Sequence, residues 1–228
     1  MASGGGAPAV RPSTRRRLLD VVVAGLGLVV SAPVLGVAAL LVRAGSPGPV
    51  LFRQERMGAG EQPFTILKLR TMDVGAAGPG ITVGNDPRVT RVGGLLRRTS
   101  IDELPQLVNI LRGEMTLVGP RPETVSLAER YPASTRWVLQ HTPGLTGPAQ
   151  VRLRDSTLAC TLSLVPRGAA PEELATLTER WYLEEVVPSR VALDEEFLAD
   201  PSLRRTFGVL AQTAVYLLRS IRGGQPAR

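Results

Sequence analysis

Residues 97–123 read RRTSIDELPQLVNILRGEMTLVGPRPE and combine two adjacent acids, an apolar helical pattern and several arginines in one short stretch. The helix can begin in two ways: Ser100 caps it, with Glu103 three residues further on, or Pro105 opens it as the first helical residue. In either case Asp102 and Glu103 lie at the positive end of the helix dipole. That position favours ionised carboxylates and a nearby magnesium-bound phosphate, so we expect the chemistry of the protein to be located here.

The same stretch predicts the elements that follow the helix. Arg112 and Gly113 form a typical helix end. Residues 115–118 suit a short strand, and Gly-Pro-Arg-Pro at 119–122 predicts a rigid turn, because its two prolines restrict the backbone. We therefore expect Arg121 to be held in one place.

Composition limits the chemistry and the partners. A chain of 228 residues predicts one catalytic domain. Its formal net charge of +7 predicts an anionic partner: nucleic acid, anionic lipid or a phosphorylated substrate. Of 27 basic residues only Lys68 is a lysine, so that position invites a specific explanation. The single cysteine, Cys160, excludes an internal disulfide and suits a reducing cytoplasm. With His141 as the only histidine, a zinc site of several His or Cys ligands cannot be assembled, and we expect a structural role for this side chain.

The first 45 residues predict an N-terminus that associates with a membrane. Residues 1–17 are rich in Gly, Ala, Pro and Ser, end in arginines and suit a disordered basic segment. Residues 18–42 carry one charge, Asp20, and are long enough as a helix to cross a hydrocarbon core of ~30 Å. The pattern alone leaves a signal peptide, a straight transmembrane helix and a re-entrant hairpin broken at Pro33 open. Arginines on both flanks favour the cytoplasmic side for both ends.

Residues 50–52 and 64–69 predict two strands of a small β-hairpin, separated by a Gly-rich turn. Alternation along the second strand places Lys68 and Arg70 on one face. Two cations on one face suit a diphosphate, whereas the simpler alternative is a solvated strand face. Residues 73–86 predict a mobile loop that could act as a lid, and residues 207–221 predict an amphipathic closing helix on the domain or the membrane surface.

The segment SIDELPQLVNILRGEMTLVGPRPE resembles the signature of the bacterial sugar transferase family, the monotopic polyprenyl-phosphate phosphoglycosyl transferases. The agreement extends in the same order through SPGPVLFRQERMG (46–58), FTILKLRTM (64–72), DPRVTRVGGLLRRTS (86–100) and PGLTGPAQV (143–151). So many blocks in one order make coincidence a poor explanation. The match is good over residues 31–151 and loose beyond, where residues 187–200 read as an insertion relative to typical members.

The resemblance implies an enzyme that moves a sugar 1-phosphate from a UDP-sugar to a polyprenyl (undecaprenyl) phosphate and releases UMP, as the first step of lipid-linked glycan assembly. It implies Mg²⁺ as cofactor, with Asp102 as nucleophile and Glu103 as the residue that binds the metal or orients the attack; both acids are the expected metal ligands. Four cations are expected to hold substrate phosphate, Arg70 being the weakest candidate: Lys68, Arg70, Arg97 and Arg121. Three residues of the PGLTGPAQV block are expected near the nucleotide: Thr146, Gly147 and Gln150.

The implied fold class is α+β, mostly helical with a small β-hairpin and an N-terminal re-entrant membrane helix-break-helix. The chain then divides into a disordered basic N-terminus (1–17), a membrane-inserted helical hairpin (18–45) and a cytoplasmic catalytic domain (46–228) on the inner leaflet of the cytoplasmic membrane. A homodimer stays open. The second functional hypothesis is a membrane scaffold that keeps the family fold without catalysis. A nucleic-acid partner is not expected, because aromatic residues make up only 4% of the chain and the apolar N-terminal run would have no role.

Overall fold

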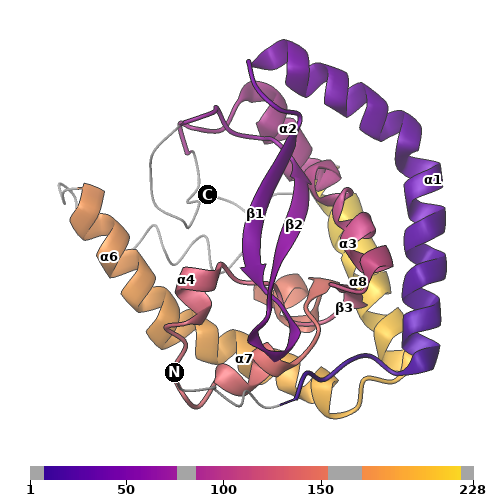
Figure 1. The fold of residues 1–228 in the computed structure, drawn as a ribbon, viewed down its shortest axis with the longest axis vertical. Coiled ribbons are helices and arrows are strands. Elements are labelled where there is room, and N and C mark those ends of the chain that lie inside the picture. Colours follow the sequence, from indigo (N-terminus) through magenta and orange to yellow (C-terminus); the bar gives the residue numbers. More distant parts are fainter. Residues whose placement is uncertain (1–7, 76–85, 154–170, 222–228) are drawn as a thin grey trace, which may run out of the picture.

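The computed structural model describes residues 8–75, 86–153 and 171–221. Figure 1 shows helices arranged around a narrow β-ribbon, so the chain has the mostly helical α+β character predicted from the sequence. The described strands form two small sheets, one antiparallel (β1–β2) and one parallel (β3–β4). Helix α1 covers one side of the domain, and α6 lies on the opposite side (Figure 1).

The predicted hairpin is present and longer than expected. Strand β1 (Leu51–Met57) pairs with β2 (Pro63–Leu69) along its whole length, from Leu51 opposite Leu69 to Met57 opposite Pro63. The sequence pattern missed this extra pairing because residues 53–56 of β1 are all polar and carry no apolar strand signal.

Helix α2 (Arg91–Thr99), a 3₁₀ turn (Ile101–Glu103) and α3 (Gln106–Arg112) follow one another. The helix end predicted at Gly113 is confirmed, since its φ of 83° lies in the left-handed region that glycine adopts most easily. The strand predicted at residues 115–118 is observed as β3 (Thr116–Val118).

The parallel partner of β3 is β4 (Gly144–Thr146), with Thr116 opposite Gly144 and Val118 opposite Thr146. Between them lie α4 (Val125–Ala128) and the 3₁₀ turn Arg136–Gln140. Strand β4 was not predicted, because three residues next to a Pro-Gly pair give too short a pattern to identify.

Residues 171–221 are almost entirely helical. They form α6 (Pro171–Trp181), a π-helical turn (Tyr182–Val186), α7 (Val187–Ala199) and α8 (Leu203–Ile221). The predicted closing helix is thus confirmed with an earlier start. Residues 187–200, which read as an insertion, instead contribute to the core: Val187 is fully buried, and Val191 and Phe197 are 7% and 4% exposed.

Helix α1 (Thr14–Gly45) is one helix of 32 residues that continues through Pro33. The structure therefore shows one helix where the sequence predicted two separated by a break. Figure 1 shows that α1 runs along the domain and then bends over it. A proline inside a helix removes one backbone hydrogen bond, which commonly produces a bend. Among the described residues, α1 is the one helix that is long and apolar enough to cross a membrane.

The N-terminal end of α1 is attached to the domain by its charged residues. Asp20 is 1% exposed and accepts hydrogen bonds from Thr116 Oγ1 at 2.7 Å and from the Leu117 amide at 3.0 Å. Arg16 donates to the Val118 carbonyl at 2.6 Å. The single acid of the apolar run is thus a tie between α1 and β3, a role that a contact across 96 residues hides from sequence inspection.

The other end of α1 packs on the same domain. Ala38 and Val42 are 3% and 4% exposed and belong to a cluster with Leu69 and Leu96. By contrast, the outer face of α1 is strongly apolar and exposed, with fractions between 59% and 79%: Leu18, Leu26, Val29, Val30, Val37 and Leu40. Exposed apolar stripes of this kind mark a surface that meets a membrane or another protein.

Candidate active site

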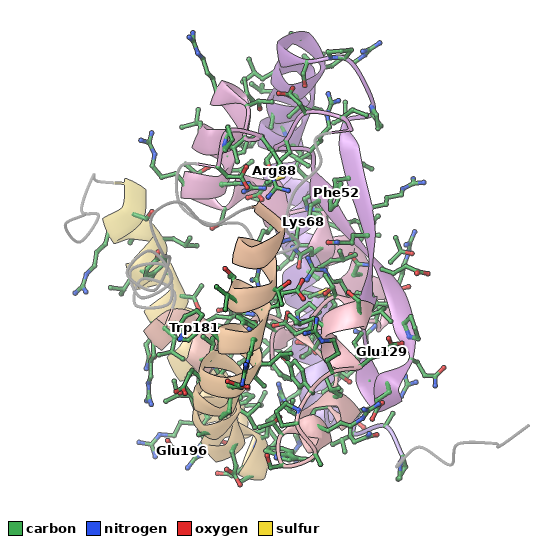
Figure 2. All side chains as sticks on the ribbon, turned by 90° about the vertical axis from the view of Figure 1, so that its left-hand side faces the viewer. Phe52, Lys68, Arg88, Glu129, Trp181 and Glu196 are labelled. Atoms are coloured by element: carbon green, nitrogen blue, oxygen red, sulfur yellow. The ribbon has the colours of Figure 1, made fainter. Side chains whose placement is uncertain are left out.

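The hairpin and the 3₁₀ turn bring a lysine and an acid together. Lys68, next to the end of β2, donates from Nζ to Glu103 Oε1 at 2.9 Å. The two side chains are 17% and 18% exposed, so the pair is shielded but reachable. Figure 2 shows Lys68 at the same end of the hairpin as Phe52, its register partner on β1. The one lysine of the chain therefore forms an ion pair with one of the two predicted acids.

Asp102 lies on the 3₁₀ turn and is 8% exposed. The turn forms because Ser100, at φ 55°, ends α2 through its backbone N–H, and α3 starts only after Pro105. Of the two predicted helix starts, the Ser100–Glu103 capping box is wrong: the Ser100 side chain caps neither the turn nor α3, and Glu103 binds Lys68. The alternative start at Pro105 is one residue early, since α3 begins at Gln106. The acids precede the α-helix rather than open it.

Arg121 reaches the same acid from the predicted turn. Its guanidinium lies 3.8 Å from Glu103 Oε1 and is 41% exposed. The turn is clamped between β3 and β4, since the Gly119 amide donates to the Thr146 carbonyl at 2.9 Å and the Gly144 amide donates to the Pro120 carbonyl at 2.8 Å. The prediction that Arg121 is held in place is consistent with this backbone.

Electrostatics join Arg97 to the group. Burial lowers the pKa of the Arg97 guanidinium, and attraction to Asp102 is the largest effect that opposes this change. Its Nε donates to Thr71 Oγ1 at 2.8 Å. Burial likewise lowers the pKa of the Lys68 ammonium, against the attraction of Glu103 and, more weakly, Asp102. Five predicted site residues therefore form one cluster of two acids and three cations: Lys68, Arg97, Asp102, Glu103 and Arg121.

Arg70 lies outside this cluster. Its guanidinium is buried and donates to the carbonyls of Ser46 at 2.8 Å, of Val42 at 3.4 Å and of Pro47. We expected Lys68 and Arg70 to lie on one face of the strand and to act together, but they do not. Strand β2 ends at Leu69, and the Arg70 side chain then points toward the C-terminal end of α1. Arg70 therefore fixes the exit of α1 from the domain.

The three residues of the PGLTGPAQV block have different surroundings. The Thr146 hydroxyl pairs with Thr213 Oγ1 of α8 at 2.8 Å. Gly147 has backbone so close that an added Cβ would lie 2.3 Å from the Gly119 carbonyl oxygen, so it serves close packing. Gln150 has a buried Nε2 without a hydrogen-bond partner, which leaves it as the one of the three with an uncommitted donor.

A pocket opens beside Arg121 and is also lined by Tyr131, His141, Arg190 and Asp194. His141 packs edge-on against Trp137 with ring centroids 5.7 Å apart, and burial lowers the pKa of its imidazole. These contacts agree with the structural role expected for it. Burial raises the pKa of the Asp194 carboxyl to about 6, although the Ala149 amide donates to it at 3.1 Å.

Sequence reasoning did not assign functions to the polar residues behind Arg121. Glu123 is 6% exposed and binds Tyr182 and Arg190, which come from the helical segment after residue 171. Glu123 was visible as the last residue of the signature, but nothing in the sequence pairs it with residues about 60 positions away.

The acid pair suits a divalent cation of the kind that prefers oxygen ligands. Within the described residues, no group of three or more His, Cys, Asp or Glu side chains gathers as a metal site. Mg²⁺ is commonly held by one or two carboxylates together with substrate phosphates and water. Asp102 and Glu103 supply the carboxylates, so the residues present fit such an ion only when a phosphorylated substrate completes the site.

The chain is similar in sequence to several named bacterial proteins. A Caulobacter vibrioides protein named UDP-glucose:undecaprenyl-phosphate glucose-1-phosphate transferase is 52% identical over 68% of this chain and 60% of its own length. An Escherichia coli protein with the same name is 47% identical over 60% of this chain and 30% of its own length. The exopolysaccharide production protein PSS of Rhizobium leguminosarum is 40% identical over 60% of this chain and 73% of its own. The chain thus spans less than two thirds of the first two relatives.

The family described as bacterial sugar transferase matches residues 12–220, which includes α1, the acid pair and the C-terminal helices. The chain belongs to the bacterial sugar transferase family.

Proposed function

We propose that this protein transfers a sugar 1-phosphate from a UDP-sugar to undecaprenyl phosphate and releases UMP. The observation that carries the proposal is the cluster itself: the buried Asp102 carboxylate next to Glu103, which binds Lys68 at 2.9 Å and lies 3.8 Å from Arg121. Such a cluster can offset the charge of a diphosphate while presenting a nucleophile to it. The names of the relatives supply the substrate class, with UDP-glucose as the first donor to test.

The proposed reaction has two steps. An oxygen of Asp102 attacks the phosphorus that bears the sugar, the bond from that phosphorus to the oxygen shared with the UMP phosphate breaks, and UMP leaves with the electron pair. The phosphate of the lipid then attacks the aspartyl phosphosugar, which forms the polyprenyl diphosphate sugar and regenerates the carboxylate. Two displacements at one phosphorus need a fixed nucleophile and fixed cations more than they need proton transfer.

The cations take separate roles in this proposal. Lys68 and Arg121 share Glu103 and thereby lie ready to exchange that carboxylate for phosphate oxygens. Arg97 balances Asp102 and keeps it ionised for attack. Asp102 and Glu103 would hold Mg²⁺ together with the substrate phosphates, and the ion would supply charge neutralisation at the diphosphate. Gln150 is the remaining candidate for nucleotide contact, through its unpartnered amide.

We also propose that α1 enters the inner leaflet and returns, so that the catalytic domain faces the cytoplasm. The support is that both ends of α1 bind one domain, through Arg16 and Asp20 at the start and through Arg70 at the end, while the outer face stays apolar. A helix whose two ends are attached to one small domain cannot place them on opposite sides of a membrane without breaking these contacts. Figure 1 shows α1 bent over the domain, and a bend at Pro33, which lies inside this helix, would give it the shape of a shallow re-entrant loop.

The orientation is tested with cysteines introduced by Ser3→Cys and Arg53→Cys, each in a Cys160→Ser background. Both should resist an impermeant thiol reagent in intact cells and react after the cells are permeabilised. Labelling of the residue 3 site alone in intact cells would show a spanning helix with an external N-terminus.

The activity is tested by measuring UMP release from a panel of UDP-sugars, with undecaprenyl phosphate and Mg²⁺, using purified full-length protein in detergent. The expected result is UMP release and a lipid-linked sugar with at least one donor, both lost on removal of Mg²⁺. Normal folding without transfer from any donor in the panel would favour the scaffold hypothesis.

A further inference from the structure

A second ionic cluster is centred on Glu123, two residues after Arg121 in the chain. The Glu123 carboxylate accepts from Tyr182 Oη at 2.5 Å and from Arg190 NH1 at 2.6 Å, and the Arg190 guanidinium also contacts the Tyr182 hydroxyl. The Glu123 and Arg190 side chains are only 7% and 12% exposed. Burial opposes ionisation of Glu123, but attraction to Arg190 and the hydrogen bond from Tyr182, with smaller effects of Arg121 and Arg56, outweigh it and hold the pKa of the Glu123 carboxyl below its ordinary value. We call Glu123, Tyr182 and Arg190 the buried triad.

The buried triad is connected to the active-site turn through two residues of backbone. The Met57 amide of β1 donates to the Glu123 carbonyl at 2.8 Å, and Arg56 NH1 donates to the Pro122 carbonyl at 3.3 Å. Glu123 is thus fixed to the hairpin by its backbone and to α7 by its side chain. Because Pro122 restricts the chain between them, a displacement of Glu123 is transmitted to Arg121.

A local distortion of the helix brings Tyr182 and Arg190 to the same carboxylate. Residues eight positions apart on a regular α-helix differ by roughly 80° around the axis. The π-helical turn Tyr182–Val186 absorbs about one extra residue, which reduces that difference to roughly 20°. Arg190 also lies over the Tyr182 ring, 5.8 Å from its centroid. The π turn therefore serves to aim two donors at Glu123, and such turns are frequent at functional sites.

Stability alone does not account for the buried triad. A buried ion pair is weak evidence for stability, since well-packed apolar residues often do as well or better. A buried ion pair does, however, favour one defined geometry, because moving either partner away leaves a buried charge without compensation. The ion pair fixes the position of Glu123, which is two residues after Arg121, and the Arg121 guanidinium lies 3.8 Å from Glu103.

We infer that Tyr182 and Arg190 are positioning residues: by holding Glu123 they fix the Gly119–Pro122 turn and aim Arg121 at the substrate diphosphate. The catalytic part of this inference rests on the proposed function, whereas the positioning part concerns the fold alone. It also assigns a role to the helical segment that carries Tyr182 and Arg190, which supports the active-site turn without touching the substrate.

The positioning part is tested by hydrogen exchange on Arg190→Met and Tyr182→Phe, compared with the wild type. Both variants should exchange faster in the peptide covering residues 118–124, with little change in α2, α3 and α8. Arg130→Met is the matched control, since it breaks the exposed Arg130–Glu179 pair at 2.5 Å between the central segment and α6 by the same substitution. Unchanged exchange at 118–124 in both variants, or an equal rise throughout the domain, would overturn the inference.

The catalytic part is tested by kinetics with UDP-glucose, or with whichever donor of the panel is used. Arg190→Met should raise KM for the UDP-sugar by about 10- to 100-fold, as expected for a misplaced binding group, while KM for the lipid phosphate stays near normal. In an Arg121→Met background, Arg190→Met should cost little more, because its effect passes through Arg121.

If the two effects multiply instead, Arg190 acts independently of Arg121 and the inference is wrong. Should Arg190→Met fail to fold, Tyr182→Phe, which removes a single hydroxyl, is judged by the same two criteria. A wild type without transfer activity would contradict the proposed function, and the exchange experiment would still decide the positioning role.

Discussion

Two ionic clusters flank the Gly119–Pro122 turn, and they differ in how fully their charges are engaged. In the first, Lys68 and Glu103 form a close pair, and Arg121 stays 3.8 Å away with 41% of its side chain exposed. In the buried triad, both charges are deeply buried and paired at 2.6 Å, with a tyrosine hydroxyl as a further donor. The first cluster keeps capacity for an anionic substrate, whereas the second has none left. We propose that the first cluster binds the substrate and that the buried triad holds the turn in place.

The largest effect is expected from a substitution in the first cluster, which we call the reactive cluster (Lys68, Arg97, Asp102, Glu103 and Arg121). Asp102→Asn should lower turnover by about 10³-fold or more, as loss of a covalent nucleophile does, because an amide oxygen cannot form the aspartyl phosphosugar. The unfolding midpoint should stay near that of the wild type. Labelled UDP-sugar with Mg²⁺ and no lipid phosphate should give one equivalent of UMP and a stoichiometric protein adduct in the wild type, and neither in the variant. If UMP appears only with lipid phosphate and rapid quench finds no adduct, Asp102 is a base or metal ligand in a direct transfer.

The second largest effect, a loss of stability, is expected when the buried triad is broken. Glu123→Ala leaves the Arg190 guanidinium buried without its carboxylate, so the free energy of unfolding should fall by about 3–5 kcal/mol. Glu103→Ala is the matched control: it removes the other acid beside the turn, where its partners Lys68 and Arg121 keep access to solvent, and its cost should stay below about 2 kcal/mol. Denaturant unfolding in detergent measures both. Equal losses would mean that the two clusters do not differ in the way proposed.

The same contrast explains how much the sequence could predict. The five residues of the candidate site were identified because most of them have local signals, namely an acid pair before a helix, a single lysine on a strand and an arginine between two prolines, and because these blocks fit the signature of a known family. The hairpin, the helix end at Gly113 and the strand after it follow from equally local patterns.

What the sequence could not show depends on long-range contacts. Asp20 is an interruption of an apolar run in the sequence and becomes a tie to β3 only when residues 96 positions apart meet. Arg70 shares a strand pattern with Lys68, but the end of β2 separates their roles. Arg190 lies in a segment without recognisable pattern, and its partner Glu123 is 67 residues away.

A smaller loss of turnover is expected from a conservative substitution at Lys68. Lys68→Arg keeps the charge but replaces a compact ammonium by a longer, planar group in a site with 17% exposure, so turnover should fall by about 10- to 100-fold. The fold should be kept, as judged by an unchanged unfolding midpoint. Arg53→Lys, the reverse exchange on the exposed strand β1, is the control and should leave turnover unchanged. Near-normal turnover of Lys68→Arg would reduce the single lysine to an accident of composition.

The smallest effect tests why one buried acid near the turn is stabilised and another is not. Arg190 and Tyr182 outweigh burial at Glu123, whereas burial raises the pKa of Asp194 from 3.8 to about 6. Above pH 6, Asp194 is charged in both the folded and the unfolded state, and its burial lowers stability. As the pH falls through 6 toward 4, the folded state takes up the proton first, so this loss is recovered.

Asp194→Asn removes the ionisation and keeps an acceptor for the Ala149 amide. The variant should therefore be more stable than the wild type at pH 8, by at most about 3 kcal/mol, which is the free energy that a rise from 3.8 to about 6 represents. The difference should shrink below pH 6 and be small near pH 4. Thermal unfolding across this range, in one detergent, measures it. A wild type that is the more stable protein at pH 8 would mean that a cation compensates the Asp194 charge as Arg190 compensates that of Glu123, and the distinction between the two acids would then fail.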